Sequence, residues 1–355
     1  MSELKSTAVL GAGVIGMSWA VLFLASGRDV AVFDTLASAE RSTRDYVETA
    51  WPALGALGLV KSGAPGRLTF HRSAADAVTD ADFVQESVPE RIEIKKAVFA
   101  EIEPALKRDA IVASSASGLT LSEMQEGWQD PSRLVLGHPF NPPHLIPLVE
   151  VLANRSTAAG VVEQAEQFYR EIGKITIRVR REVPGHIANR LQAALWREAL
   201  HLVRTGVASV RDVGTAVWAG PGLRWAAMGP TMLFHLGAGP GGISSFCERY
   251  AASFNRWWDD LGALWMRRSR SNCRKESQRT SAVRRPPSSQ RSGTRSSSRC
   301  KRRSCSCSGR DGSDGERDED RRPPGARSRS HASAASRSIS AEGTTRCRRR
   351  RRRAA

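Results

Sequence analysis

Six consecutive residues near the amino terminus have the types and spacing that bind the pyrophosphate of a dinucleotide. They form a G-x-G-x-x-G sequence and are Gly11, Ala12, Gly13, Val14, Ile15 and Gly16. Gly11 permits a tight turn, Gly13 lets the backbone approach the pyrophosphate, and Gly16 lets the following helix lie close to the strand. Free N–H groups at the start of that helix would face the phosphates. The spacing therefore predicts a dinucleotide site.

The elements that must position this turn lie within residues 7–34. The order is an apolar strand, the glycine turn, an apolar helix, a second strand and then Asp34. Asp34 follows the last glycine by about the 20 residues expected of a carboxylate that accepts both ribose hydroxyls. Small residues at such a turn often serve packing alone, but here the strand, the helix and the acid all agree. No arginine follows Asp34 directly, so a 2′-phosphate would be repelled and NAD is predicted over NADP.

The chain up to residue 183 alternates between strand and helix patterns. Helices are expected at 37–59 and 91–106, and strands or apolar runs at 68–70, 82–85, 110–113, 135–136, 148–152 and 175–179. This alternation predicts an α/β, Rossmann-type domain over residues 1–183, with a mostly parallel sheet covered on both faces.

From residue 184 only helix patterns remain. They cover 187–204, 210–218, 228–236 and 243–258, with glycine-rich turns at 219–222 and 237–242. We expect a second, all-helical substrate and dimerisation domain over 184–265, which is incomplete. We predict no metal site.

Residues 266–355 differ in composition from the rest. Of 54 Lys and Arg and 36 Asp and Glu, 28 and 8 lie from residue 267 onward, which leaves 26 and 28 before it. No Leu, Phe, Trp or Tyr occurs after residue 266, so a disordered basic tail is expected. One interpretation is a GC-rich gene read out of frame. The other is non-specific binding of nucleic acid or another polyanion through residues 348–353, the only nucleic-acid contact we expect.

The cysteines are also distributed unevenly along the sequence. Cys247 is the one cysteine before residue 267, and the other five lie in the tail. A cofactor-binding body with one cysteine is typical of a reducing compartment. The first ten residues enter a strand directly and no apolar run reaches the roughly 18 residues of a membrane span. We therefore expect a cytoplasmic protein without membrane contact.

Three further motifs point to a family. They are SSAS at 114–117, GHPFNPP at 137–143 with Glu150 after it, and PGHIANR at 184–190. Together with the glycine turn, and in this order, they resemble the 3-hydroxyacyl-CoA dehydrogenase family over about residues 5–262. The resemblance implies that His138 is the catalytic base, Glu150 its partner, and Ser117 and Asn189 the groups around the substrate oxygen.

These residue types suit that chemistry. Oxidation of a secondary alcohol by NAD needs a base for the hydroxyl proton, and histidine is matched to this task near neutral pH. A carboxylate behind the imidazole selects the tautomer and stabilises the imidazolium. Alternatively, His138 is a core histidine, Ser117 a turn residue and Asn189 a helix cap.

The resemblance also places Glu90, Lys95 and Asn141 near the nicotinamide ribose. Three other histidines have no partner that we can name, and we interpret them as structural: His144, His186 and His235.

Residues 220–242 look more like the L-carnitine dehydrogenase branch of this family, and its lambda-crystallin-type relative, than like the acyl-CoA enzymes. Residues 34–60 carry only Arg41 and Arg44 as bases, few for CoA phosphates. Trp218, Trp225 and Phe234 could hold a trimethylammonium group, unless they are core residues of the helical domain.

The leading hypothesis is therefore an NAD-dependent dehydrogenase of a small 3-hydroxy acid, most simply L-carnitine, acting as a homodimer if the helical domain is complete. The alternatives are an L-3-hydroxyacyl-CoA dehydrogenase and a crystallin-like protein that holds NAD without turnover. Intact Ser117, His138, Glu150 and Asn189 argue against the last.

Overall fold

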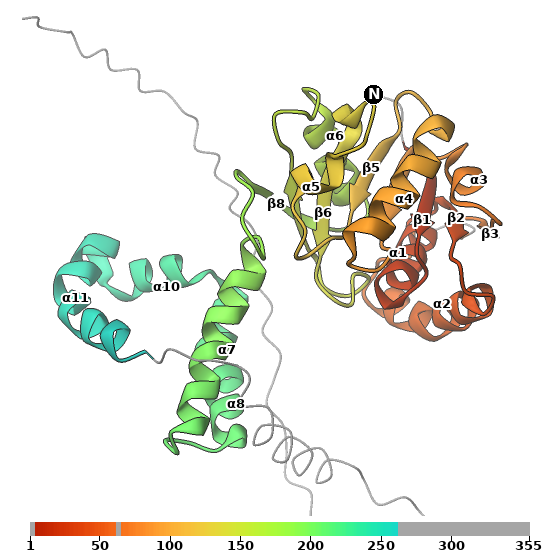
Figure 1. Cartoon of the computed structure of the whole chain (residues 1–355). Helices are drawn as coiled ribbons and strands as arrows, with labels where there is room; N and C mark the ends of the chain where they lie inside the picture. Colours follow the sequence, from red (N-terminus) through yellow and green to blue (C-terminus); the bar gives the residue numbers. More distant parts are fainter. Residues whose placement is uncertain (1–3, 62–64, 262–355) are drawn as a thin grey trace, which may run out of the picture. The chain divides into compact units, whose positions relative to one another are not determined.

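The fold is that of a computed structural model, which describes residues 4–61 and 65–261. These residues belong to one compact unit of the chain, residues 1–288. Eight strands form one sheet in the order β3-β2-β1-β4-β5-β6-β7-β8 (Figure 1). The strands are β1 (Ser6–Leu10), β2 (Asp29–Phe33), β3 (Leu68–Phe70), β4 (Phe83–Glu86), β5 (Ile111–Ser114), β6 (Leu134–Pro139), β7 (Leu148–Leu152) and β8 (Ile175–Val179). All neighbouring pairs are parallel except β6 and β7. The α/β, mostly parallel prediction is confirmed.

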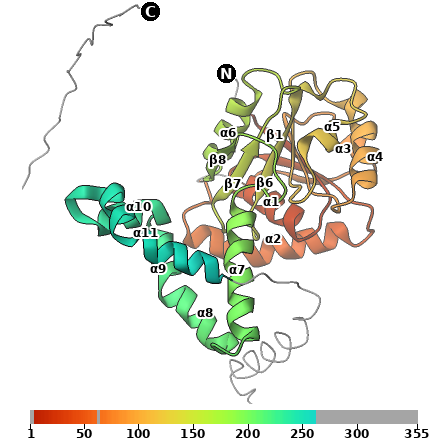
Figure 2. The same ribbon diagram turned by 60° about the vertical axis from the view of Figure 1, so that its left-hand side comes forward.

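Helices cover both faces of the sheet (Figure 2). One apolar cluster joins α1 (Val14–Ala25), α2 (Ala39–Ala56) and α6 (Val161–Glu171) to one face. The other joins α3 (Ala74–Val78), α4 (Ile92–Ile102) and α5 (Leu121–Gln125) to the opposite face. Alternate strand residues divide between the clusters, as Val9 and Leu10 do in β1, because successive side chains of a strand point to opposite faces. The sheet is thus buried on both sides, which explains its nearly continuous apolar strands.

The remaining helices form the segment after the sheet. They are α7 (Ala188–Arg204), α8 (Val210–Ala219), α9 (Pro221–Ala227), α10 (Pro230–Gly237) and α11 (Gly242–Asp260). Short 3-10 turns occur at Glu103–Ala105, Pro131–Arg133 and Gly239–Gly241. No helix among the described residues is long and apolar enough to cross a membrane.

Several elements differ from expectation. The turn expected at 219–222 is instead the start of α9, because Pro221 occupies the first helical position, where a missing N–H costs nothing. The sequence analysis did not identify α3, α5 and α6. The expected tail lies outside the described residues, as do the last residues of the expected helical domain.

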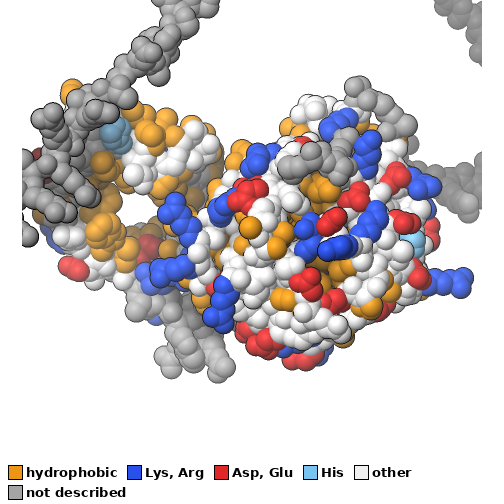
Figure 3. Space-filling model, turned by 90° about the horizontal axis from the view of Figure 1, so that it is seen from above, with side chains coloured by type: hydrophobic (Ala, Val, Ile, Leu, Met, Phe, Trp, Pro, Cys, Tyr) orange, Lys and Arg blue, Asp and Glu red, His pale blue; other side chains and the backbone are white. Residues whose placement is uncertain are grey.

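The helical segment exposes many large apolar side chains. Among them are Leu191 and Trp196 on α7, Trp218 on α8, and Trp257 and Trp258 on α11. Figure 3 shows orange side chains gathered over this segment, whereas blue and red side chains are interspersed over the visible face of the sheet domain. Because large exposed apolar patches mark interaction surfaces, this segment is a candidate interface.

Candidate active site

A cavity of about 450 Å³ lies at the carboxyl ends of the parallel strands. Ligands of open α/β sheets bind at this edge, where the strand order reverses around β1. Seven of the residues predicted from the sequence line it: Ile15, Glu90, Lys95, Ser117, His138, Asn141 and Asn189. The lining also includes residues for which the sequence predicted no role: Ser87, Ser115, Phe140 and Gln192.

His138 and Glu150 face each other across the one antiparallel strand pair. They are direct partners in the β6–β7 register, and His138 Nδ1 lies 2.8 Å from Glu150 Oε2. A carboxylate only accepts hydrogen bonds, so Nδ1 carries the proton and Nε2 presents a lone pair. His138 is 5% exposed and Glu150 is fully buried. The dyad can therefore accept a proton at Nε2 while Glu150 stabilises the resulting charge.

Glu150 also holds the first turn of α7. Its Oε1 accepts hydrogen bonds of 2.9 Å from the N–H groups of Ile187 and Ala188. Burial raises the pKa of Glu150, but the hydrogen bonds from His138 and these two N–H groups outweigh it, so the pKa lies below its usual value. One ionised carboxylate thus orients the base and fixes the turn that carries Asn189.

The glycine before the base is explained by packing. A Cβ added at Gly137 would lie 2.0 Å from the hydroxyl oxygen of Tyr169. Any side chain there would displace this buried hydroxyl, so β6 and α6 approach closely only because residue 137 is glycine.

Glu90 organises the loop that carries Ser117. Its Oε1 accepts hydrogen bonds from three consecutive N–H groups, those of Ser117, Gly118 and Leu119, at 2.6–3.1 Å. The three donors fix the backbone beside Ser117. Glu90 therefore has a structural partner in addition to the cofactor contact that the family resemblance implies.

Lys95 is held in a buried ion pair. Its Nζ lies 2.7 Å from Glu86 Oε1, and both side chains are at most 1% exposed. Ser114 Oγ and the Val88 N–H also donate to the Glu86 carboxylate, which satisfies both of its oxygens. Glu86 was not identified from the sequence. Its position as the last residue of β4, nine residues before Lys95, is the signal that could have found it.

The glycine turn fits a dinucleotide. Gly11 has φ +90°, and an added Cβ would lie 2.7 Å from the Ser87 carbonyl oxygen, whereas a Cβ at Gly13 would meet nothing within 4 Å. Gly13 precedes α1 and offers no side-chain cap to its first N–H groups. Asp34 Oδ2 accepts from the Ala12 N–H at 2.6 Å, which places the carboxylate at the end of β2 beside the turn. These residues could hold the pyrophosphate and the adenine ribose of NAD.

One histidine interpreted as structural lies beside the base. The His186 ring centroid is 5.1 Å from that of His138, and its Nε2 is 3.2 Å from the Ala116 carbonyl oxygen. The side chain is 4% exposed and its Nδ1 has no hydrogen-bond partner. Burial lowers the pKa of His186, so the ring is neutral and donates from Nε2. The other two histidines have partners away from His138. His144 Nδ1 lies 2.7 Å from Ser18 Oγ, and His235 Nδ1 accepts a hydrogen bond from the Ile243 N–H.

The three aromatic residues proposed to hold a substrate are not among the residues that line the cavity. The Phe234 ring stacks on Phe246 with centroids 4.5 Å apart, which joins α10 to α11. Trp218 is 64% and Trp225 36% exposed. Within the described residues, Phe234 is therefore half-buried in the contact between α10 and α11, and the two tryptophans lie on the surface of α8 and α9.

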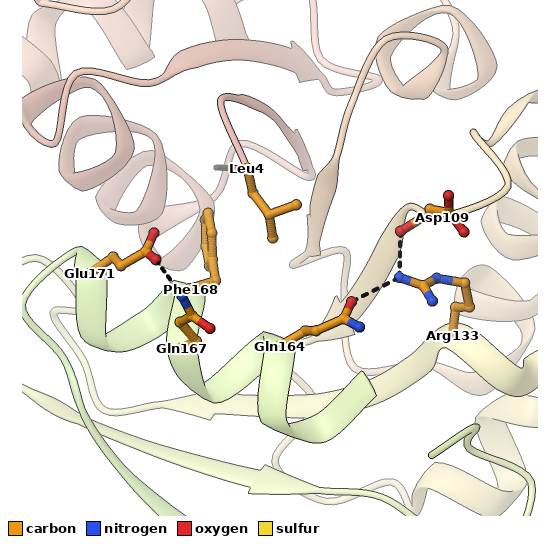
Figure 4. A pocket seen from close by; sticks show the side chains of 7 residues that line it. All are labelled: Leu4, Asp109, Arg133, Gln164, Gln167, Phe168 and Glu171. Atoms are coloured by element: carbon orange, nitrogen blue, oxygen red, sulfur yellow. Dashed lines mark hydrogen bonds between the residues drawn. The ribbon is translucent and has the colours of Figure 1, made fainter. Parts of the chain in front are cut away.

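A second hollow, of about 230 Å³, lies at the amino ends of the strands (Figure 4). Arg133 there contacts Gln164 Oε1 and the Asp109 carbonyl oxygen, and Gln167 Nε2 donates to Glu171. These polar groups pair with one another, so the hollow leaves fewer hydrogen-bonding groups for a ligand than the cavity beside His138 does.

Comparison with known proteins agrees with this geometry. The family model of the 3-hydroxyacyl-CoA dehydrogenase NAD binding domain matches residues 6–183, and that of the C-terminal domain matches residues 185–268. L-carnitine dehydrogenase of Streptomyces coelicolor is 47% identical over 261 residues, which are 74% of this chain and 82% of that protein. The Streptomyces griseus enzyme of the same name is 46% identical over 74% and 78%.

Among solved structures, 5-formyl-3-hydroxy-2-methylpyridine 4-carboxylic acid 5-dehydrogenase, an NAD⁺ dependent dismutase, superposes with a TM-score of 0.69 and 32% identity. The superposition covers 79% of this chain and 87% of that one. The resemblance stated from the motifs and the prediction of NAD as cofactor are both confirmed. The chain belongs to the 3-hydroxyacyl-CoA dehydrogenase family and is an NAD-dependent 3-hydroxy acid dehydrogenase.

Proposed function

We propose that the chain oxidises the 3-hydroxyl of L-carnitine to 3-dehydrocarnitine, with His138 as general base and Glu150 as its orienting carboxylate. The observation that carries this proposal is the 2.8 Å contact between His138 Nδ1 and Glu150, which leaves Nε2 as the free base beside the cavity. The names of the relatives at 46–47% identity support carnitine as the substrate.

The residues divide the work of the reaction. His138 Nε2 takes the hydroxyl proton, and the ionised Glu150 stabilises the imidazolium that results. Ser117 and Asn189, which both line the cavity, supply hydrogen bonds to the substrate oxygen. When bound at the glycine turn and Asp34, NAD would supply the acceptor for the hydride of the carbinol carbon. Glu90 and Lys95 hold the loops around the nicotinamide ribose.

A small substrate is favoured over an acyl-CoA by the charges after β2. Arg44 is paired with Glu40 at 2.8 Å, and its guanidinium lies over the Phe70 ring at 5.3 Å. The carboxylate and the ring thus already engage one of the two bases in residues 34–60. This segment is a poor partner for CoA phosphates, which is why the L-3-hydroxyacyl-CoA activity is the second candidate.

We retain the sequence prediction that Trp218 and Trp225 contact the trimethylammonium group, although neither residue lines the cavity beside His138. A quaternary ammonium is attracted to aromatic faces by about 0.5–2 kcal/mol per contact. We therefore expect Trp225→Ala to raise the KM for carnitine far more than the KM for NAD. Equal changes in the two constants would contradict the assignment.

The test is NADH formation by the purified chain with L-carnitine and, separately, with L-3-hydroxybutyryl-CoA. We expect a higher kcat/KM with carnitine, and loss of NADH formation in His138→Ala. Faster turnover of the acyl-CoA substrate would favour the second candidate. Retained activity in His138→Ala would remove the proposed base.

A further inference from the structure

A chain of four hydrogen-bonded side chains runs from the core of the sheet domain to the wall of the cavity. The Tyr169 hydroxyl donates to Gln85 Oε1 at 2.7 Å, Gln85 Nε2 donates to Ser115 Oγ at 2.8 Å, and Ser115 Oγ lies 2.9 Å from Ser87 Oγ. Tyr169 and Gln85 are fully buried, whereas Ser115 and Ser87 line the cavity. None of the roles assigned above uses this chain of contacts.

The donor-to-acceptor direction of these hydrogen bonds is fixed at the buried end of the series. Gln85 Nε2 lies 3.4 Å from the Gly137 carbonyl oxygen, and a carbonyl can only accept, so the amide nitrogen and not the oxygen must face it. Burial raises the pKa of Tyr169, so its hydroxyl stays protonated and donates to Gln85 Oε1. Ser115 Oγ therefore always receives a hydrogen bond from Gln85.

The proton count then leaves one donor unused. Ser87 and Ser115 carry two hydroxyl protons, and the contact between their oxygens consumes one of them, whichever residue donates. The acceptor of that contact keeps its own proton. Because both oxygens belong to the cavity wall, the pair presents one hydrogen-bond donor to an acceptor oxygen of a bound ligand.

The strand order indicates which ligand oxygen this is. Ser87 follows β4 and Ser115 follows β5, and these strands lie between β1, which leads to the glycine turn, and β6, which carries His138. The hydride must pass between the nicotinamide and a substrate carbon beside His138. The nicotinamide ring therefore lies near the ends of β4 and β5.

We propose that Ser87 and Ser115 together donate one hydrogen bond to the carboxamide oxygen of the nicotinamide and so set which face of the ring is turned toward His138. The inference rests on NAD as the cofactor and does not depend on carnitine as the substrate. The two serines share the spare proton, so either hydroxyl can serve when the other is removed.

The experiment measures equilibrium binding of NADH and of ADP-ribose, which lacks the nicotinamide, to the full chain. The variants are Ser87→Ala, Ser115→Ala and their double substitution. Ser122→Ala is the control, because that hydroxyl donates to Glu182 and does not line the cavity. The double variant should bind NADH about three- to tenfold more weakly, with unchanged affinity for ADP-ribose. In each single variant, the logarithm of the Kd for NADH should change by less than half as much as in the double variant.

Three results would overturn the proposal. They are unchanged NADH affinity in the double variant, an equal loss of ADP-ribose affinity, and a loss in Ser122→Ala as large as in the double variant. No substrate is present in these measurements. A chain that failed to oxidise carnitine would therefore refute the proposed function and leave this test intact.

Discussion

At the scale of single residues, Glu150 is the side chain on which most of the site depends. It accepts from the base and from two N–H groups of α7, and it is fully buried. A neutral amide of the same size could still accept from His138 Nδ1–H. Its NH₂ group would then face the N–H groups of Ile187 and Ala188, so donors would oppose donors.

The first prediction concerns Glu150→Gln. We expect kcat to fall by about 10²-fold, because the imidazolium loses its charge partner. Steady-state rates at saturating substrate measure the effect. An unchanged kcat would show that Glu150 does not stabilise protonated His138.

Glu150 also makes the free energy of unfolding depend on pH. Its pKa in the folded chain is below the unfolded value, so its contribution to stability is present above the unfolded pKa and is lost as pH falls through the folded pKa. Between pH 6 and 3, the free energy of unfolding of the unaltered chain should therefore fall more steeply than that of Glu150→Gln. Parallel curves in urea titrations would contradict this.

His186 is strained as well as buried. Its φ of +49° lies in the left-handed region, where non-glycine residues are uncommon and Asn, Asp and His are the types most often found. We expect His186→Asn, which tolerates this conformation and can donate to the Ala116 carbonyl, to keep most of the stability. His186→Leu should lower the free energy of unfolding by about 1–3 kcal/mol because it leaves that carbonyl unpaired. Equal losses in urea unfolding of the two variants would refute the hydrogen bond.

At the scale of elements, one antiparallel strand pair builds the catalytic dyad. In a parallel sheet, residues twelve apart in sequence cannot lie opposite each other on neighbouring strands without a long crossover. The short 140–147 connection between β6 and β7 makes this possible, and Lys174, just before β8, supports it. Its Nζ donates to the carbonyl oxygens of Pro143 and Ile146.

Burial of Lys174 gives a second pH prediction. Burial lowers the pKa of Lys174 to about 7, well below the 10.5 of a free lysine. Between these values the unfolded chain binds a proton that the folded chain has lost, so stability should rise with pH, by at most about 1.4 kcal/mol per pH unit. The difference in unfolding free energy between the unaltered chain and Lys174→Met, measured from pH 7.5 to 9.5, should show this slope. A flat difference would mean that Lys174 stays protonated.

The sequence predicted most elements because their signals are local. The glycine turn, the apolar strands and the motif around His138 are each readable from a few neighbouring residues. The Glu86–Lys95 pair, the Gln85 network and the position of His186 beside His138 were missed because each depends on strands or turns meeting in space. His186 in particular is 48 residues from His138, and only the turn before α7 brings the two rings together.

At the scale of the whole molecule, the helical segment is the least buried part of the described chain. Leu200 is the one buried residue of α7, a helix of 17 residues, and Leu191 and Trp196 on it are 66% and 52% exposed. Such surface is typical of an interface between protein chains. A second copy of this chain is the occupant that we expect, and the sequence predicts such a homodimer if the helical domain is complete.

The corresponding prediction is self-association that depends on α7. We expect the full chain to sediment as a dimer at micromolar concentration and Leu191→Glu to shift it toward the monomer. Leu57→Glu is the matched control, because that leucine, at the end of α2 in the sheet domain, is 57% exposed. Monomer in all three proteins, or an equal shift in both variants, would contradict an interface on α7. Unchanged NADH binding would show that the variants are folded.

We propose that the chain removes a hydride from C3 of L-carnitine while His138 accepts the hydroxyl proton. The most direct measurement is a single-turnover reaction of NAD with L-carnitine deuterated at C3, followed by mass spectrometry of the cofactor. We expect reduced cofactor that carries deuterium with the unaltered chain and none with His138→Ala at the same reaction time. Reduced cofactor without deuterium, or deuterium transfer from C3-deuterated 3-hydroxybutyryl-CoA alone, would contradict it.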